Sequence, residues 1–390
     1  MVELIALGEL GEVVSGSTPS TTKSDYWNGD IPWITPADLT GHEGAYFHGT
    51  LRKITAAGFK SCSTRMLPKN SIIFSSRAPI GHCAVTAFPL CTNQGFKSLI
   101  PGAHLHPFYG YFALRFFTPA LIAQGRGATF AEINKEIFED FRIPVPPLEE
   151  QQRLAALLDK ADHLRRTRRY AQQLSDTFLQ SVFLEMFGDP ATNPKGWSVE
   201  SIDDVLASSQ YGTSEKSNQH RQGYPVLGMA NVSYSGELLL DDLAYVALSP
   251  AEFEKLRLRP GDIIFNRTNS PELIGKVAHW NLTMDAVVAS YLVKLCLNKH
   301  VLPDYFSALL NSPHYKHLFR ERCKKAVNQA NLSPTLLREF SVMVPPLPLQ
   351  QQFAQIVGRV ERLRAQQREA ARQAEHLFQT LLHRAFRGEV

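Results

Sequence analysis

The sequence predicts an α+β protein in which two mixed α/β domains are joined by two long helices that pair as an intramolecular coiled coil. Three observations lead to this prediction. The chain of 390 residues repeats itself, and each copy ends in about 40 residues of helical periodicity. The segments before these helices alternate short apolar runs with turn residues. We expect globular domains at residues 1–146 and 190–345, and long helices at 147–189 and 346–390.

Composition and charge exclude several classes of protein. Hydrophobic residues make up 44% and charged residues 20% of the chain, which is typical of a globular protein and not of a disordered one. No apolar run approaches the ~18 residues of a membrane helix, and the first residues lack the basic start and apolar stretch of a secretory signal. Five scattered cysteines without a Cys-x-x-Cys pair indicate reduced thiols, so we expect a cytoplasmic protein. The net charge of +4 permits a nucleic-acid partner without indicating one.

The internal duplication is the strongest signal in the sequence. Val145–Leu148 recurs as Val344–Leu347, an offset of 199 residues, and nine of the 21 positions from Val145 to Arg165 are identical in the second copy. The front halves correspond more loosely, through Ser71–Phe74 and Ile263–Phe265. These runs are short, apolar and bounded by turn residues, so we expect strands there and at 286–289. Short amphipathic helices are expected at 109–117 and 305–310. Strands and helices do not alternate regularly, so we do not expect a doubly wound sheet.

Each copy changes to a helical pattern after its Pro-Pro step. Residues 148–187 and 347–386 contain no Gly or Pro except Pro348, which falls in the tolerated first turn, and Gly358. A helix of 40 residues would be ~60 Å long, and its apolar stripe has to be buried against another long object. We expect that object to be the other long helix. The alternative is that each helix packs only on its own globular domain.

No catalytic or cofactor-binding motif is recognisable. The sequence lacks Gly-x-Gly-x-x-Gly and Gly-x-x-x-x-Gly-Lys-Ser/Thr loops, and both Pro-Pro steps follow Val rather than the Asn or Asp of an amino-methyltransferase motif. His314 and His317, and likewise His104 and His106, have no Cys or acidic partner at metal-ligand spacing, so we interpret them as solvated histidines. We therefore predict a chain with no catalytic residues, no metal ligands and no cofactor of its own.

Several motifs resemble those of the specificity subunit of type I restriction–modification enzymes. That family has two target-recognition domains, each followed by a long helix that begins near Pro-Pro-Leu-x-x-Gln, which appears here as Pro146–Gln151 and Pro345–Gln350. Its opening Gly-x-Thr-Pro turn and Pro-Trp-Ile stretch appear at 16–19 and 32–35, and its Gly-small-Thr segment appears at 127–130. The resemblance covers essentially the whole chain and depends on the order and duplication of the motifs.

The second copy departs from the family pattern in three places. It has Tyr211-Gly212-Thr213-Ser214 instead of the Gly-x-Thr-Pro turn, and residues 326–329 instead of Gly-Ala-Thr. Before the motif glutamine it has Pro348-Leu349 instead of Glu-Glu. These departures affect the base-reading residues of the second domain more than the architecture.

The resemblance implies a non-catalytic subunit that reads an asymmetric, bipartite target on double-stranded DNA. The two long helices would be antiparallel, and methyltransferase subunits, expected to be two, would dock on them and methylate adenine N6. Restriction subunits can join such a complex, which then acts in defence against foreign DNA. S-adenosylmethionine, ATP and Mg would be bound by the partner subunits. The alternatives are a duplicated, non-catalytic scaffold that binds protein or carbohydrate, and an enzyme whose site is distributed along the chain.

Candidate DNA contacts are side chains able to hold phosphates or to discriminate bases through paired hydrogen bonds. Arg77 and Arg267 rank highest because both follow the recurring Ile-Ile-Phe strand. The candidates in the first domain are Ser17, Thr18, Lys23, Arg77, Gln94, Lys97 and Arg126, and those in the second are Thr213, Lys216, Asn266, Arg267, Lys324, Lys325, Asn328 and Gln329.

The C-terminal part of each long helix is apolar over a wider face than a single helix seam needs. We expect this excess surface to bind a methyltransferase. The residues are Phe178, Val182, Phe183, Met186 and Phe187 in the first helix, and Leu377, Phe378, Leu381, Leu382 and Phe386 in the second. A basic run at Arg165, Arg166, Arg168 and Arg169 is either a solvated helix face or a contact to DNA or to an acidic patch on a methyltransferase.

Overall fold

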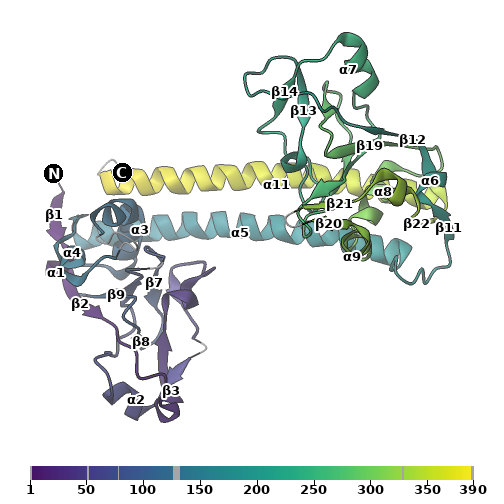
Figure 1. Cartoon of the computed structure of the whole chain (residues 1–390). Coiled ribbons are helices and arrows are strands. Elements are labelled where there is room, and N and C mark those ends of the chain that lie inside the picture. Colours follow the sequence, from purple (N-terminus) through teal and green to yellow (C-terminus); the bar gives the residue numbers. More distant parts are fainter. Residues whose placement is uncertain (1, 51, 78, 126–131, 327–328, 388–390) are drawn as a thin grey trace. The chain divides into compact units, whose positions relative to one another are not determined.

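The computed structural model describes residues 2–50, 52–77, 79–125, 132–326 and 329–387. The chain divides into two compact units. Unit 1 comprises Met1–Ala171 and Gln367–Val390, and unit 2 comprises Gln172–Gln366. Each unit therefore contains one globular part together with portions of both long helices (Figure 1). None of the helices within these described ranges has the length and apolar character needed to cross a membrane.

The globular part of unit 1 is a mixed α/β domain. Its helices are α1 (Leu7–Leu10), α2 (Ala56–Lys60), α3 (Pro107–Gln124) and α4 (Lys135–Asp140). Its strands are β1 (Glu3–Ala6), β2 (Gly11–Ser15), β3 (Trp27–Ile34), β4 (Tyr46–Phe47), β5 (Lys53–Ile54), β6 (Ile72–Phe74), β7 (Cys83–Thr86), β8 (Cys91–Thr92), β9 (Lys97–Pro101) and β10 (Arg142–Val145). The main sheet has the order β2-β9-β6-β7-β4, β5-β3-β8 form a smaller sheet, and β1 pairs antiparallel with β10.

The globular part of unit 2 repeats this plan. Its helices are α6 (Ile202–Val205), α7 (Pro250–Leu256), α8 (Pro303–Leu310), α9 (Pro313–Arg322) and α10 (Pro334–Arg338). Its strands are β11 (Ser198–Ser201), β12 (Leu206–Tyr211), β13 (Tyr224–Leu227), β14 (Ala244–Val246), β15 (Asp262–Asn266), β16 (Thr268–Asn269), β17 (Val277–Trp280), β18 (Val287–Val288), β19 (Leu292–Leu297), β20 (Lys324–Ala326), β21 (Gln329–Asn331) and β22 (Ser341–Val344). The main sheet has the order β12-β19-β15-β17, and β11 pairs antiparallel with β22. This strand order matches β2-β9-β6-β7 of unit 1, as the duplication predicts.

The strands and short helices expected from the sequence are present. The Ile-Ile-Phe runs form β6 and β15, and residues 286–289 contain β18. The predicted helix at 109–117 is longer, since α3 extends from Pro107 to Gln124 and accommodates Pro119.

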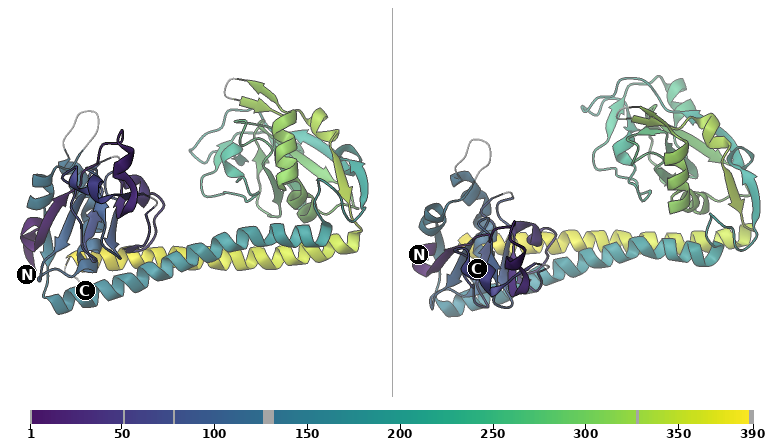
Figure 2. Two further views of the ribbon diagram at one scale, coloured as in Figure 1. Left: turned by 90° about the horizontal axis from the view of Figure 1, so that it is seen from below. Right: turned by 60° about the horizontal axis from the view of Figure 1, so that its bottom comes forward.

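Two long helices follow the Pro-Pro steps: α5 (Leu148–Phe187) and α11 (Leu347–Arg387). The start of α5 and the end of α11 belong to unit 1, and the end of α5 and the start of α11 belong to unit 2, so the helices run antiparallel. Within each unit they lie side by side (Figure 2). They contact each other through an ion pair of 3.2 Å between Arg165 and Glu375 in unit 1. In unit 2 the rings of Phe183 and Phe353 lie 5.7 Å apart. The predicted pairing of the two long helices is confirmed.

A buried glutamine anchors the first turn of each long helix. Gln151 donates hydrogen bonds to the carbonyl oxygens of His104 and Pro146, both at 2.9 Å, and accepts one from the amide of His106 at 2.8 Å. Gln350, at the equivalent position, donates to the carbonyls of His300 and Pro345 and accepts from the amide of Leu302. The glutamine of the repeated motif therefore joins each helix to the segment before α3 or α8.

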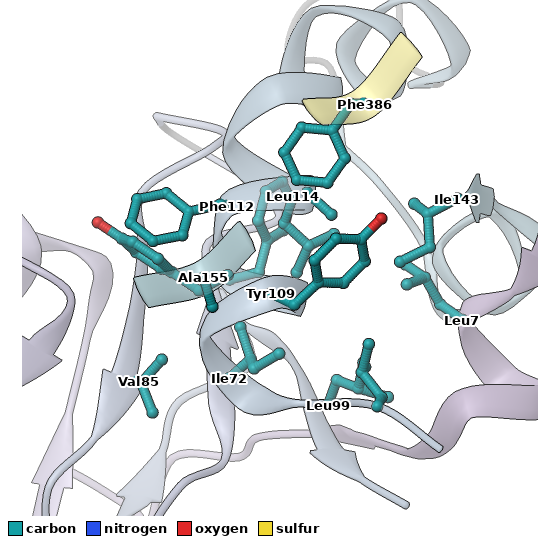
Figure 3. Close-up of a cluster of buried hydrophobic side chains, with 14 of the residues drawn as sticks. Leu7, Ile72, Val85, Leu99, Tyr109, Phe112, Leu114, Ile143, Ala155 and Phe386 are labelled. Atoms are coloured by element: carbon teal, nitrogen blue, oxygen red, sulfur yellow. The ribbon is translucent and has the colours of Figure 1, made fainter. Parts of the chain in front are cut away.

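The core of unit 1 is built from the main sheet, α3 and both long helices. Tyr109 and Phe112 of α3 are fully buried against Ile72 of β6. Ala155 of α5 and Phe386 of α11 pack into the same cluster, as Figure 3 shows. The long helices therefore bury apolar side chains in the globular parts as well as against each other.

This packing corrects the prediction that the apolar ends of the long helices are left for a partner. Phe183 and Phe187 are buried in the core of unit 2, where Val182 and Met186 also pack. Phe378, Leu382 and Phe386 are buried in the core of unit 1, and Leu381 packs against it. The prediction was wrong for the five buried phenylalanine and leucine residues because helical periodicity identifies an apolar face but not what covers it. Val182, Met186 and Leu381 are partly buried by the same packing. Phe178 and Leu377 alone of the predicted set are exposed.

The basic run of α5 is largely neutralised within unit 1. Asp162, which is 1% exposed, accepts hydrogen bonds from Arg165 at 2.6 Å and from Arg166 at 2.9 Å. Glu375 of α11 lies 2.7 Å from Arg169. Arg165 and Arg169 therefore stabilise the contact between the two helices, whereas Arg166 is paired within α5. Arg168 is exposed and has no described ion pair.

Candidate nucleic-acid interface

Three strands of unit 1 meet at one edge of the main sheet, where most of the predicted contacts of this unit lie. β2 ends at Ser15, which pairs with Lys97 at the start of β9. β6 runs antiparallel to β9 and is followed by Ser75, which pairs with Phe96. Because antiparallel neighbours alternate in direction, the ends of β2 and β6 and the start of β9 share an edge. We call this edge the strand-end site of unit 1; it comprises Ser17, Thr18, Ser76, Arg77, Gln94, Lys97 and Glu132.

A glycine allows the chain to turn closely after β2. A Cβ on Gly16 would lie 2.1 Å from the carbonyl oxygen of Asn93, so any other residue would clash with the backbone there. The next residue, Ser17, donates its amide to the carbonyl of Thr92 at 2.9 Å. The Gly-Ser-Thr-Pro turn is thereby held against the residues that precede β9.

The side chains beyond this turn are polar and reach the surface. The hydroxyl of Thr18 donates to the side-chain oxygen of Gln94, which is exposed. The amide nitrogen of Gln94 remains able to donate two hydrogen bonds. These two predicted residues are brought together, although they are 76 positions apart in the sequence.

Lys97 places a largely buried charge in the strand-end site of unit 1. Its side chain is 8% exposed, and its Nζ lies 3.8 Å from the carboxylate of Glu132 and 3.5 Å from the hydroxyl of Ser76. Burial lowers the pKa of Lys97, the carboxylate of Glu132 raises it, and the nearby Arg77 lowers it again. Glu132 is 43% exposed, so its carboxylate can still accept a hydrogen bond from an external donor such as a cytosine amine.

Two predicted residues of unit 1 are not part of this site as described. Lys23 is exposed on the loop before β3, where its Nζ lies 3.3 Å from the hydroxyl of Tyr26 and 5.2 Å from the centre of that ring. Arg126 lies outside the described residues.

Unit 2 has an equivalent strand-end site. β12 ends at Tyr211, β15 ends at Asn266, and β19 starts at Leu292 between them in the sheet. A Cβ on Gly212 would lie 2.1 Å from the carbonyl oxygen of Val288, so the close turn after the first strand is repeated. We call this edge the strand-end site of unit 2; it comprises Thr213, Arg267, Ser290, Lys324, Gln329 and Asn331.

Arg267 is held at the centre of this second site. Its guanidinium donates to the side-chain oxygen of Asn331 at 3.1 Å and to the carbonyl of Ser290 at 3.3 Å, and it lies 5.2 Å from the ring of Tyr211. Its Nε is buried without a described hydrogen-bond partner, whereas Nη1 and Nη2 each have one described bond and can donate a second. A fixed, planar guanidinium with unused donor capacity is suited to bind a guanine edge or a phosphate.

The other predicted residues of unit 2 differ in accessibility. Thr213 is buried, and its amide donates to the carbonyl of Val288 at 2.8 Å, so it supports the turn. Lys216 is exposed on the loop after it. Lys324 and Gln329 are exposed on the hairpin formed by β20 and β21. Asn328 lies outside the described residues, and only the backbone of Lys325 is described.

Asn266 requires a correction. It is fully buried, donates to the carbonyl of Thr268 at 3.2 Å and accepts from the side chain of Asn269 at 2.9 Å. The expectation that it contacts DNA was wrong, because its side-chain amide is used to shape the turn after β15.

The two arginines that ranked highest do not occupy equivalent positions. The amide of Ser76 donates to the carbonyl of Gly95, and its carbonyl accepts from the amide of Ile133. In unit 2 the amide of Arg267 donates to the carbonyl of Tyr291, and the carbonyl of Arg267 accepts from the amide of Leu332. Arg267 therefore corresponds to Ser76, one residue before Arg77.

Sequence reasoning missed Glu132 and Asn331, which contact the central cation in each site. They are 199 residues apart, so the offset of the duplication could have paired them. Asn331 also donates to the hydroxyl of Thr268 at 3.0 Å. No group of three or more potential metal ligands is assembled among the residues that the structure describes.

Comparison with known proteins identifies the family. The profile described as "Type I restriction modification DNA specificity domain" matches residues 2–172 and 194–373. The MjaIX specificity subunit of a type I restriction enzyme from Methanocaldococcus jannaschii is 37% identical over 215 residues, which cover 51% of this chain and 50% of that protein. The EcoKI specificity subunit from Escherichia coli K12 is 27% identical over 290 residues, which cover 68% and 61%. The matched region thus spans about half to three-fifths of these relatives.

Solved structures agree on the fold. The S subunit of a type I restriction-modification system from M. genitalium superposes with a TM-score of 0.62 at 14% identity, over 99% of this chain and 96% of that chain. A structure from a study of assembly and conformational transition of the type I R-M system superposes with a TM-score of 0.57 at 20% identity, over 100% and 98%. The duplicated domains, the paired long helices and the profile match together show that this chain belongs to the type I restriction modification DNA specificity family.

Proposed function

We propose that this chain is the non-catalytic, DNA-reading subunit of a type I restriction–modification complex in the cytoplasm. Each unit would read one half of a bipartite duplex target, and partner subunits would supply methylation of adenine N6 and, where present, ATP-dependent restriction. S-adenosylmethionine, ATP and Mg would be bound by those partners.

One observation carries the proposal of two different half-sites. The same three strand ends form a polar site in both units, but the residues at equivalent positions differ in charge and shape. Unit 1 offers the exposed carboxylate of Glu132 and has the buried Ser76 where unit 2 offers the guanidinium of Arg267. Unit 2 has the amide of Asn331 where unit 1 has Glu132. Since these groups prefer different base edges, the two halves of the target should differ in sequence.

Two pairs of exposed apolar side chains, here called docking patches, are candidates for docking the methyltransferase. In unit 1, Leu164 of α5 and Leu377 of α11 are 39% and 44% exposed, and they flank the ion pair of Arg165 with Glu375. In unit 2, Leu363 and Phe178 stand at the positions related to these by the offset of 199, and are 49% and 50% exposed. Two equivalent patches on a duplicated chain support two copies of one partner.

Changing one patch at a time tests this docking. The double variant Leu164→Ser with Leu377→Ser should reduce the methyltransferase that co-purifies from two copies to one, and changing all four residues should remove both. Leu239→Ser, which alters a 46% exposed leucine on a loop of unit 2, is the matched control. Two bound copies after all four changes would contradict the docking patches.

Mapping of methylated adenines in the genome tests the whole proposal. A strain that carries this gene and its methyltransferase should show two methylated adenines, on opposite strands, at a fixed separation within an asymmetric target. Deleting this gene alone should remove both marks. An unchanged methylation pattern after the deletion would contradict the proposed function.

A further inference from the structure

Two cationic side chains in unit 2 lie over the ring of Tyr234, and a third cation lies close to one of them. Lys316 and Arg320 project from successive turns of α9, and their charged groups lie 4.8 Å and 5.6 Å from the centre of that ring. The guanidinium of Arg320 also donates to the hydroxyl of Tyr234. Lys276, which precedes β17, is near enough to Lys316 to lower its pKa.

None of these cations has a described ion pair with a carboxylate. The Nζ of Lys316, a residue only 3% exposed, donates to the carbonyl of Gly275 at 2.7 Å. The Nζ of Lys276, 8% exposed, donates to the carbonyl of Met229 at 3.1 Å. Burying like charges together destabilises a fold unless an anion compensates them or one group loses its proton, and a bound anion favours the protonated form. The cluster therefore has the charge of an anion-binding site.

The cluster adjoins the strand-end site of unit 2. The amide of Asn266, the last residue of β15, donates to the carbonyl of Lys276 at 2.8 Å, and Arg267 follows directly. The helix that carries Lys316 and Arg320 ends two residues before Lys324 at the start of β20. An anion bound here would lie beside the residues proposed to read bases.

Unit 1 has no counterpart of Lys276. The amide of Ser75 donates to the carbonyl of His82, just as that of Asn266 donates to the carbonyl of Lys276, so His82 occupies the position of Lys276. The shared scaffold therefore does not supply a lysine at this position in both units.

We propose that Lys276, Lys316, Arg320 and Tyr234 form a phosphate-binding site that holds the DNA backbone beside the half-site read by unit 2. This inference rests on the proposed function. Two lysines supply compact charge, the arginine supplies paired donors, and the tyrosine ring orients the cations, which together suit a phosphodiester. A contact of this kind fixes the position of the protein on the duplex without selecting bases.

The salt dependence of binding tests the site directly. The complex of this chain with its methyltransferase is titrated with its target duplex at several salt concentrations. Losing one phosphate contact should reduce the slope of log affinity against log salt by about 0.9. Arg320→Gln, on an exposed side chain, should produce this change and leave the preferred target sequence unaltered. Lys316→Met should act in the same way, with its melting temperature measured to verify folding.

A control variant and a phosphate titration distinguish failure of this site from failure of the proposed function. Lys299→Met changes an exposed lysine beyond the opposite end of β19 and should keep the wild-type slope. Wild-type slopes in both test variants would overturn the site while the proposed function stands, whereas a wild-type complex that binds no duplex would overturn the proposed function itself. A third outcome is that inorganic phosphate raises the melting temperature of the wild type but not of Arg320→Gln, while both proteins have the same slope of log DNA affinity against log salt. The site would then bind a free phosphoryl group, and its assignment to DNA would be overturned.

Discussion

Arg267 of unit 2 occupies the backbone position that Ser76 occupies in unit 1. The amide of Ser76 donates to the carbonyl oxygen of Gly95, and the amide of Arg267 donates to that of Tyr291. The carbonyl oxygens of Ser76 and Arg267 accept from the amides of Ile133 and Leu332, which are related by the duplication. The duplicated scaffold thus encloses a small, buried hydroxyl at this position in one unit and carries a partly exposed guanidinium in the other. A change of one side chain at a fixed position therefore decides whether that position offers hydrogen-bond donors to a base edge.

The buried glutamines at the start of the long helices should be important for stability. Gln151→Leu removes three hydrogen bonds and leaves the His106 amide without its partner, so we expect the free energy of unfolding of unit 1 to fall by ~2–4 kcal/mol. Gln152→Leu changes the adjacent, exposed glutamine and should have little effect. Urea unfolding measures both variants, and equal stability of the two would contradict this role of Gln151.

The carboxylate of Glu375 should make unit 1 sensitive to acid. Burial raises the pKa of Glu375, but hydrogen bonds from Gln379, Arg165 and Arg169 more than offset this and lower it to about 2. Its usual pKa is 4.5, so its contribution to stability is present above pH 4.5 and is lost as the pH falls toward 2. The melting temperature of Glu375→Gln should lie below that of the wild type at pH 6, with a difference that shrinks on acidification. A difference independent of pH would contradict this coupling.

Lys316 should have the opposite dependence in unit 2. Burial, together with Lys276 and Arg320, lowers its pKa from 10.5 to about 7. The unfolded chain then binds more protons between these values, so this lysine destabilises the fold most below pH 7, and stability is regained as the pH rises toward 10.5. In the absence of DNA, Lys316→Met should therefore stabilise unit 2 more at pH 6 than at pH 9. Melting curves of both proteins give this comparison, and an equal effect at the two pH values would contradict it.

Much of the fold could be predicted because it depends on local patterns and on the duplication. The helical stretches after the Pro-Pro steps, the Ile-Ile-Phe strands and the antiparallel helix pair all follow from periodicity and repetition. The offset of 199 also relates Gln151 to Gln350, whose hydrogen bonds are the same.

The candidate site could be predicted only in part because side-chain burial depends on tertiary contacts. The sequence does not reveal that Asn266 is enclosed by the turn after β15, or that Phe183 and Phe386 pack into globular cores. The offset also changes along the repeat: Phe74 and Phe265 are 191 residues apart, whereas Ile133 and Leu332 are 199 apart. Matching Arg77 to Arg267 by their order after a strand therefore missed the true register by one residue.

The most direct test of the account is selection of bound duplexes from a library randomised over both halves of the target. The methyltransferase complex is prepared with the wild-type chain, with Glu132→Gln in unit 1 and with Arg267→Ser in unit 2. Each variant should lose ~1–3 kcal/mol of base discrimination in one half only, a different half for each, with the other half and the separation unchanged. A variant that relaxes both halves, or two variants that relax the same half, would contradict the claim that each unit reads its own half-site.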